Sequence, residues 1–416
     1  MTSEIDANTA ALTPTEKAAA LHNLRSTLLP RPHSPNLNPS PPSSSIIATC
    51  SAPSPTIAPL NLIGRGTCGR VYTQPSSAFV WKQAVSQSWE QNLAYENELQ
   101  KRTFRVFEET RAALVDDGKE WELPLVPDAF EYMERPSPAL LEAGQAGAGI
   151  PRGSEVDAHL SVRRSDRIFP IPRGTREAII DLFSPEQSTV AKTREWRALQ
   201  KAHRGNEDAI VRVYLGRAGG RESRKGFSVL TTWGLRNFGL DRGMLVRALP
   251  RPQVNNAGTE DIDMTPLLSL ARQMARALAI SHHLLHNDAN DVEFVLGCTS
   301  LTSSETRLWM LDFDKVRPLP DRRTMMRESV TLAAKSVDEN DPYFCQPPAV
   351  ESAVGEDGVD EEDRRVVEEL WKAQRDAYEE MSEWIARRME DQEEAEVVMT
   401  WTREFVSALE EGAWSS

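Results

Sequence analysis

The sequence predicts an α+β fold with two lobes, a small β-rich N-terminal lobe and a mostly helical C-terminal lobe, preceded by a disordered N-terminal arm. Three observations predict it. Short apolar runs bounded by Gly and Pro are concentrated between residues 60 and 240, which is typical of strands and turns. Segments with apolar residues at helical spacing dominate residues 241–416. Residues 30–59 are rich in Pro, Ser and Asn and carry too little apolar surface to offset the entropy lost on ordering.

The overall composition limits the partners that the chain can have. Its 416 residues are enough to bury a large core, and its formal net charge of −14 argues against nucleic acid, because phosphate binding needs a basic surface. The N-terminus does not resemble a signal peptide, and no apolar run approaches membrane-spanning length. The cysteines lack CxxC spacing and suggest reduced thiols: Cys50, Cys68, Cys298 and Cys345. We expect an intracellular protein, cytoplasmic or nuclear, with no membrane or nucleic-acid partner.

The first predicted unit, residues 1–59, combines a short helix with the Pro/Ser-rich arm. Residues 13–28 have an apolar stripe at helical spacing, and Thr13 or Thr15 is suited to cap the helix. The rest of this unit reads as a tether. We therefore expect residues 1–58 to be disordered overall and dispensable for folding.

A glycine-rich turn opens the second unit, residues 60–240. Gly64, Gly66 and Gly69 lie between an apolar pair and a second apolar run, and residues 79–82 then read as a strand that ends at Lys82. A dinucleotide-binding fold needs a helix after the third glycine, whereas here a strand and a Pro-containing turn follow. This order favours a glycine hairpin over nucleotide phosphates, with Lys82 reaching them. The alternative is a structural hairpin with a snorkelling lysine.

The remainder of the second unit is a mixture of helices and strands. Residues 89–109 form a helix that carries Glu96 and Glu98, and we expect Glu98 to pair with Lys82 because of its register with the apolar residues that follow. The other expected elements are a strand pair over 121–133, an inserted loop over 136–172, helices over 174–183 and 187–203, strands over 209–215 and 227–230, and a segment crossing between lobes over 235–240.

The third unit, residues 241–416, contains two aspartates that the predicted hairpin brings to the same end. A buried helix over 265–283 leads to a polar loop with Asp288, and two short strands over 294–296 and 308–311 then deliver Asp312. Two carboxylates at one end of the predicted hairpin can hold a divalent metal and accept a proton, as phosphoryl transfer requires. Two charged helices over 364–390 and 393–410 end the chain.

The order of these parts resembles the protein-kinase-like fold from about residue 60 onward. The run over 288–297 and the Leu-Asp-Phe-Asp run over 311–314 also resemble a fungal family of kinase-like proteins of uncharacterised function. The resemblance implies that Gly64, Gly66, Gly69 and Lys82 bind ATP. It implies that Asp288 stands where a kinase has its catalytic base and that Asp312 stands where a kinase holds Mg²⁺ or Mn²⁺.

Three departures from the kinase pattern bear on activity. Glu293 replaces the Asn that ligates metal, Asn290 replaces a phosphate-contacting Lys, and Asp314 replaces a flexible Gly. We therefore expect a degenerate kinase-like protein that binds nucleotide weakly or not at all and acts through an unknown protein partner. The first alternative is an active atypical phosphotransferase that uses Asp288, Glu293 and Asp312. The second is a zinc site built from the histidines at 282, 283 and 286 with Asp288.

Overall fold

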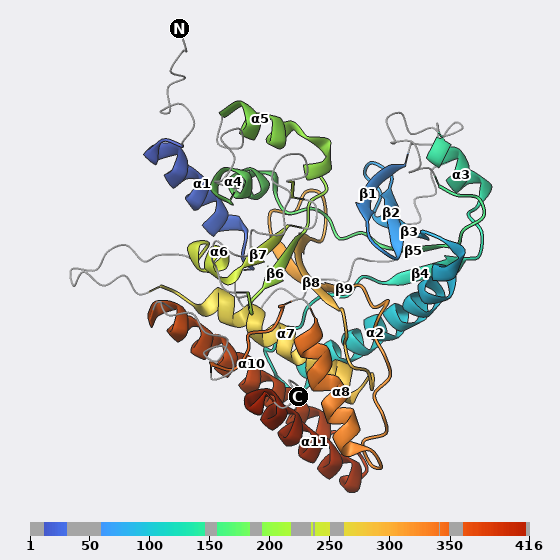
Figure 1. Cartoon of the computed structure of the whole chain (residues 1–416), viewed down its shortest axis with the longest axis vertical. Coiled ribbons are helices and arrows are strands. Elements are labelled where there is room, and N and C mark those ends of the chain that lie inside the picture. The colour runs from blue at the N-terminus through green and yellow to red at the C-terminus, as the bar shows by residue number, and fades with distance from the viewer. Residues whose placement is uncertain are drawn as a thin grey trace, which may run out of the picture.

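The computed structural model describes residues 12–30, 60–145, 156–183, 194–217, 234–235, 238–249, 262–340, 342–348 and 361–412. The fold is mixed α+β, with a β-sheet in the N-terminal half and helices at the C-terminal end, as the sequence predicts. Figure 1 shows the first sheet and its helix on one side of the molecule and the larger helical part on the other. The chain beyond the described residues includes most of the predicted arm and the strand expected over 227–230.

The first sheet is antiparallel and has the strand order β1-β2-β3-β5-β4. Its strands are β1 (Asn61–Arg65), β2 (Gly69–Thr73), β3 (Phe79–Ala84), β4 (Ala129–Met133) and β5 (Val162–Asp166). After a 3-10 turn, η2 (Gln87–Trp89), the long helix α2 (Glu90–Asp116) contacts β3, β4 and β5. The strand–turn–strand arrangement predicted for the glycine-rich segment is therefore present.

The inserted loop expected over 136–172 contains regular structure. Helix α3 (Pro138–Gln145) lies within it, and β5 occupies a central position between β3 and β4. The sequence of β5, Val-Arg-Arg-Ser-Asp, lacks the apolar runs by which strands were predicted. Arg163 nevertheless belongs to the interior, because its side chain is 6% exposed and is paired with a glutamate of α2.

A second sheet, of order β7-β6-β8-β9, lies at the centre of the molecule. Its strands are β6 (Val211–Tyr214), β7 (Gly239–Asp241), β8 (Glu293–Cys298) and β9 (Thr306–Leu311). Strand β7 pairs in parallel with β6, so residues 239–240, at the end of the segment expected to cross between lobes, belong to this sheet. The first sheet ends at Asp166, and the boundary at residue 240 stays a prediction.

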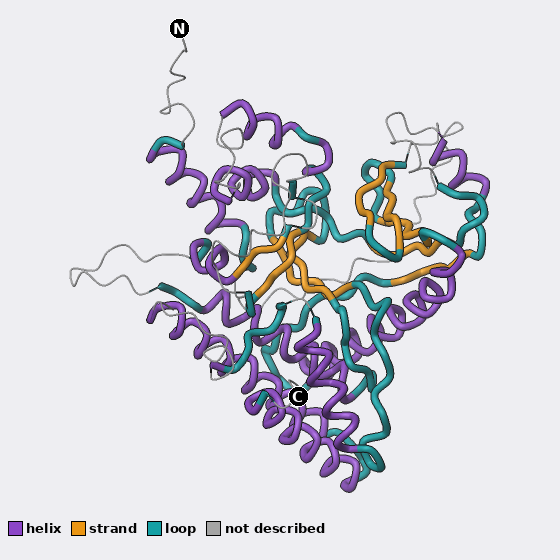
Figure 2. The backbone as a smooth tube through the Cα atoms, viewed as in Figure 1, coloured by secondary structure: helices purple, strands orange, loops and turns teal. Residues whose placement is uncertain are grey.

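Helices surround the second sheet and form the larger part of the core. On the side of the second sheet where the N-terminal helix lies are α4 (Arg173–Phe183), α5 (Arg194–Ala202), η3 (Arg204–Asn206) and α6 (Arg242–Arg247). On the other side, α7 (Thr265–His283) is buried along nearly its whole length and packs against α10 (Glu361–Arg387). Helix α11 (Gln392–Glu411) packs against both α10 and α8 (Met326–Glu339). Figure 2 shows α7, α8, α10 and α11 grouped together below the orange strands of the second sheet.

The first helix, α1 (Pro14–Thr27), is part of the core. Thr13 caps it and forms a capping box with Glu16, as the capping residues predict. Leu24 and Leu28 are fully buried, and the carbonyl of Leu28 accepts a hydrogen bond from Thr306 Oγ1 at 2.6 Å. Helix α1 also packs against α4. The expected disorder of residues 1–58 is therefore wrong for this helix, which covers apolar surface, and the expectation that the segment is dispensable for folding stays a prediction.

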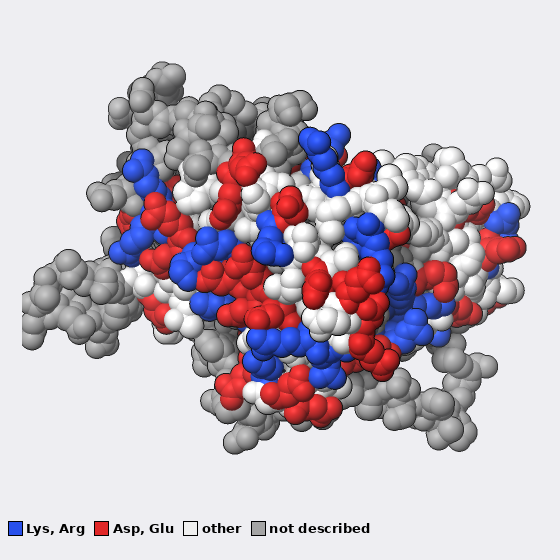
Figure 3. Space-filling view, turned by 90° about the horizontal axis from the view of Figure 1, so that it is seen from below, with Lys and Arg blue, Asp and Glu red and all other residues white. Residues whose placement is uncertain are grey.

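The described surface is rich in charge of both signs. On the face seen from below, basic and acidic side chains alternate (Figure 3). Several of them pair along or between helices, such as Lys372 with Asp376 on α10 and Arg323 with Asp391 beside α11. Within the described ranges, no helix has both the length and the apolarity needed to cross a membrane. Three of the four cysteines lie in those ranges, at positions 68, 298 and 345, and all three are free and buried.

Candidate functional site

Lys82 is the centre of a charged cluster between the first sheet and the second. Strand β3 places it opposite Val71 of β2. Its Nζ donates to both carboxylate oxygens of Glu96 at 2.8 and 2.9 Å and to Oδ1 of Asp312 at 2.9 Å. A lysine ammonium has three donors, so carboxylates occupy all of them. This cluster connects β3, α2 and the residue that follows β9.

The partner of Lys82 on α2 is Glu96, and the sequence-based choice of Glu98 was wrong. The side chain of Glu96 is 1% exposed and also accepts from Arg163 Nη2 at 2.6 Å. Glu98 is 72% exposed and pairs with Lys101 one turn further along the helix. Two residues along a helix correspond to a rotation of roughly 200°, so the two glutamates point to opposite sides. Burial of Glu96 is possible because Lys82 and Arg163 both compensate its charge.

The charges around Lys82 and Asp312 shift the pKa values of these two groups. Burial alone would lower the pKa of Lys82, but the carboxylates of Glu96 and Asp312 outweigh it and raise the pKa above its usual value. Burial likewise would raise the pKa of Asp312, and the ammonium of Lys82 outweighs it, so that the pKa lies below its usual value. Lys82 and Asp312 are therefore charged at neutral pH.

The glycine hairpin lies directly against Lys82. The backbone N–H of Gly66 donates to the carbonyl of Gly69 at 2.9 Å and closes the turn between β1 and β2. A Cβ atom on Gly69 would come within 2.9 Å of Cε of Lys82, so any side chain there would displace the lysine. Gly64 faces Val71 of the adjacent strand. The absence of a side chain at residue 69 is thus needed for the observed position of Lys82.

The tip of the hairpin lies near the segment after β9. Burial, with the nearby carboxylate of Asp314, raises the pKa of Cys68 to about 12. Burial also raises the pKa of Asp314, to which the charge of Asp312 contributes.

The β8–β9 hairpin brings Asp312 beside Glu293, whereas the sequence predicted that it would bring Asp312 to the same end as Asp288. Glu293 pairs with Leu311, the residue before Asp312. The carboxylate of Glu293 is bonded to Arg212 of β6. Burial raises the pKa of Glu293 to about 7, with Arg212 opposing the rise and Asp312 adding to it. Two carboxylates at one edge could hold a divalent cation together with phosphate oxygens, because hard cations prefer oxygen ligands.

Asp288, the predicted base, is buried and bonded on both carboxylate oxygens. Its Oδ2 accepts from Arg317 Nε at 2.8 Å and from Ser336 Oγ at 3.1 Å. Its Oδ1 accepts from the backbone N–H groups of Arg317 at 2.9 Å and Asn290 at 3.0 Å. Four donors therefore occupy the lone pairs of this carboxylate. In this structure Asp288 anchors the 315–318 segment.

Strained backbone is concentrated in these same segments. His286, Ala289, Asp291 and Asp312 all have positive φ angles, between 49° and 64°. Left-handed conformations cost non-glycine residues free energy and persist where the surroundings impose them. The loop around Asp288 and the residue at the end of β9 therefore have a conformation fixed by tertiary contacts.

The histidines proposed as an alternative zinc site have other partners. His282 Nδ1 lies 2.8 Å from the hydroxyl of Tyr378, and His283 Nδ1 lies 3.1 Å from Arg322 Nη1. His286 is exposed on the following loop. Across the described ranges, no group of three or more His, Cys, Asp or Glu side chains is arranged to hold a metal ion. The zinc alternative is therefore not supported.

Comparison with known proteins gives one partial match. A family model, DUF3669, described as "Zinc finger protein", matches residues 308–390. The matched part is about a fifth of the chain and extends from β9 through α8 and α10. It includes Asp312 but no other residue of the Lys82 cluster. No similar curated protein and no similar solved structure was found.

Sequence reasoning missed three residues that complete the site, Arg163, Arg212 and Arg317, and it named Glu96 only as the alternative to Glu98. The three pair with Glu96, Glu293 and Asp288 respectively. All three are arginines, whose planar guanidinium suits buried pairing with carboxylates. Arg212 was detectable as a charged residue within an alternating apolar strand. The pairing of Glu96 with Arg163 could be recognised only once helix α2 and strand β5 had been placed against each other.

Proposed function

We propose that the chain is a degenerate kinase-like protein that acts as a regulatory or interaction module, with weak or no nucleotide binding. The observation that carries the proposal is the state of Asp288, whose carboxylate is occupied by Arg317, Ser336 and two backbone N–H groups. A residue in the position of a kinase base needs a free lone pair directed at the substrate hydroxyl. Here that lone pair stabilises the fold.

The Lys82 cluster supports the kinase-like part of the proposal. Its glycine hairpin, its lysine bonded to a helical glutamate and its nearby aspartate are the parts that a nucleotide-phosphate site requires. The lysine must leave Asp312 before it can contact a phosphate, which weakens binding. On the face that Figure 3 shows, basic and acidic side chains of the described residues alternate and form no continuous basic field for nucleic acid, which supports a protein partner.

Calorimetry of ATP binding in the presence of Mg²⁺ or Mn²⁺ tests the proposal. Wild type, Lys82→Ala and Asp312→Ala should all bind ATP weakly or not at all, and none should transfer phosphate to water or to protein. Lys101→Ala, on the exposed face of α2, is the matched control for Lys82→Ala. Tight, metal-dependent binding by wild type that both site variants lose, accompanied by turnover, would overturn the proposal.

The second candidate is an active phosphotransferase using Asp288, Glu293 and Asp312. One observation favours it: the pKa of Glu293 is about 7, because burial disfavours its charge, so at neutral pH a divalent cation could replace its proton. This candidate predicts that Mn²⁺ affinity rises as the pH rises through about 7 and that Glu293→Gln abolishes this dependence. Pull-down with the wild-type chain and Asp288→Ala separates the candidates, because a module keeps its partner after that substitution.

A further inference from the structure

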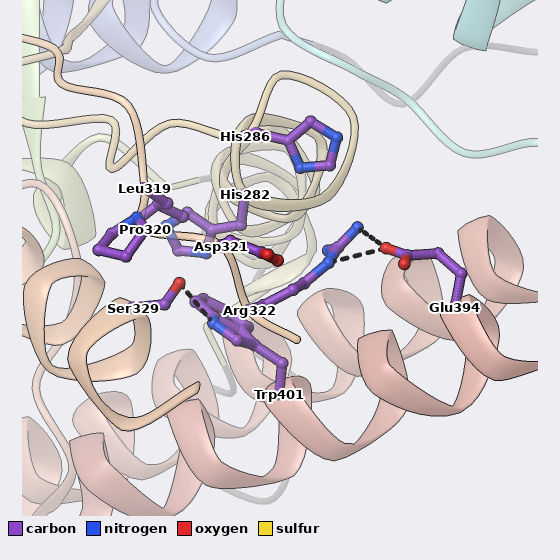
Figure 4. Close-up of a pocket in the computed structure, with 9 residues that line it drawn as sticks. All are labelled: His282, His286, Leu319, Pro320, Asp321, Arg322, Ser329, Glu394 and Trp401. Carbon is purple, nitrogen blue, oxygen red and sulfur yellow. Dashed lines mark hydrogen bonds and ion pairs between the residues drawn. The ribbon is translucent and has the colours of Figure 1, made fainter. Parts of the chain in front are cut away.

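The polar groups at a cavity among the C-terminal helices are paired with each other. The cavity has a volume of about 250 Å³. Figure 4 shows that Arg322 is bonded there to Glu394, at 2.6 and 3.0 Å. The indole N–H of Trp401 donates to Ser329 Oγ at 3.0 Å. These contacts fix the packing of α8 and α11, whereas a guanidinium whose donors are not occupied in this way lies on the first sheet.

That guanidinium belongs to Arg164 of β5, which lies against two phenylalanine rings. The preceding residue, Arg163, pairs with Glu96 of α2, so the alternation of side chains along a strand directs Arg164 to the face away from α2. The guanidinium carbon of Arg164 lies 5.3 Å from the ring centroid of Phe79 and 5.7 Å from that of Phe130. The two rings meet edge to face, with their centroids 5.3 Å apart. These three side chains, at positions 79, 130 and 164, form the Arg164 patch.

The guanidinium of Arg164 has no hydrogen-bond acceptor among the described residues. Its Nε is buried and has no partner there. Its two Nη atoms make no hydrogen bond either, but they are not buried, and the side chain as a whole is 38% exposed. The carboxylate of Glu131 lies 3.8 Å from Nη2, which is beyond hydrogen-bond distance. The Nη groups are therefore open to an acceptor that another molecule brings.

We propose that the Arg164 patch is the docking surface for a protein partner that presents a carboxylate beside an apolar side chain. The carboxylate accepts from the Nη groups of Arg164, and the apolar side chain covers the ring of Phe79, which is 36% exposed. Arginine and aromatic side chains are enriched at the centres of protein interfaces and carry much of their binding energy. The inference rests on the proposed function, an interaction module, and adds the surface and the chemistry of its partner.

The charges around the patch favour a carboxylate over other anions. Glu131 stays beside Arg164 after docking, so a phosphate dianion meets about twice the repulsion that a carboxylate monoanion meets. Nucleic-acid bases can also stack on arginine and phenylalanine, but the formal net charge of −14 opposes the approach of a polyanion. The repulsion on a single carboxylate of a protein partner is smaller and is screened beyond about 10 Å.

Selection from a phage-displayed library of random heptapeptides tests the proposal. The library is first depleted on Arg164→Gln and then passed over wild type, so that the retained peptides are those that depend on the guanidinium. We expect retained peptides to carry Asp or Glu next to Phe, Leu or Trp. Retained peptides without a carboxylate, or the retention of none, would overturn the proposal.

Variants measured by fluorescence polarisation with a retained peptide test each part of the patch. Arg164→Gln should weaken binding at least about ten-fold, as expected for a hydrogen bond to a charged group, and Phe79→Ala at least about five-fold. Glu131→Gln removes the competing carboxylate and should strengthen binding by about three-fold. Arg173→Gln changes an arginine that is 84% exposed on α4 and should leave binding unchanged.

Glu131→Gln keeps the guanidinium and decides the test even if Arg164→Gln does not fold. Binding that this variant leaves unchanged or weakens would refute the proposed charge complementarity. Single-stranded oligothymidylate is measured in the same way, and tighter binding of it than of the peptide, lost in Arg164→Gln, would overturn the protein partner. The peptide assay contains no nucleotide. Metal-dependent ATP turnover would therefore overturn the proposed function alone, and acidic peptides that require Arg164 would still establish the surface.

Discussion

Substituting the two glutamates of α2 separately gives the sharpest test of the Lys82 cluster. Glu96→Gln keeps the size and the acceptor oxygen of the side chain but removes its charge. The side chain of Glu96 is 1% exposed and faces Lys82, 13% exposed, and Arg163, 6% exposed. Removing one member of a buried ion pair leaves its partner uncompensated and typically costs about 3–5 kcal/mol. Asp312 still compensates Lys82, so we expect the lower end, about 3 kcal/mol.

Glu98→Gln is the matched control, because it makes the same chemical change two residues further along the same helix. Glu98 is 72% exposed, and its pair with Lys101 is screened by solvent. We expect a change within about 0.5 kcal/mol. Urea unfolding followed by tryptophan fluorescence measures both variants against wild type. Equal effects of the two substitutions, or a larger effect of Glu98→Gln, would refute the assignment of Glu96 as the partner of Lys82.

Three other perturbations test separate parts of the fold. Leu24→Ala removes a fully buried side chain of α1 and should lower the free energy of unfolding by about 2–5 kcal/mol in a urea titration. The unfolded chain binds a proton at His282 near the ordinary pKa of 6.5, whereas burial lowers the folded value to about 3, so the thermal midpoint should fall as the pH drops between these values. Arg317→Ala leaves the buried Asp288 without its guanidinium and should cost about 1–3 kcal/mol, also measured with urea.

Each of these perturbations has a control elsewhere in the chain. Leu199→Ala removes the same atoms from a side chain that is 68% exposed and should change stability by less than about 0.5 kcal/mol. His282→Phe should flatten the decline at low pH, whereas His22→Phe, on the exposed side of α1, should leave it unchanged. Lys315→Ala is the control for Arg317→Ala. Lys315 is two residues from Arg317, and its substitution removes only an exposed ion pair with Asp291. A control as destabilising as its partner would remove the basis for that prediction.

Much of the fold was predictable from apolar spacing, and the errors have a common physical cause. The helix over 265–283 and the two strands that follow were placed correctly because their apolar periodicity is strong and their burial nearly complete. Strand β5 was misread as part of a loop, and the packing of α1, itself predicted as a helix, was not expected, because a charged strand and a short helix beside a Pro-rich stretch look solvent-exposed until their partners are known. The interior position of Arg163 depends on Glu96, from which it is separated by 67 residues.

The candidate site was predictable in its parts but not in its pairing. Asp288 and Asp312 were expected at one end of the β8–β9 hairpin, whereas in the structure Asp312 bonds to Lys82 and lies beside Glu293. Their charge partners come from α2, β5 and β6, and the side chain that faces a given carboxylate is decided by helix rotation and strand register. Asp288 was predicted as a free carboxylate because its ligands, Arg317 and Ser336, lie 29 and 48 residues downstream.

The docking of α1 has a consequence for the order in which this chain can fold during synthesis. Helix α1 is made before the other described helices, but the hydroxyl that bonds to the Leu28 carbonyl belongs to Thr306, 278 residues later. At about 5–20 residues per second, the ribosome needs roughly 15 to 55 seconds to make the intervening chain. Throughout that interval Leu24 and Leu28 have no completed surface to cover. Helix α1 is therefore one of the last described elements to reach its native position, and a nascent chain stalled before residue 306 presents it to chaperones.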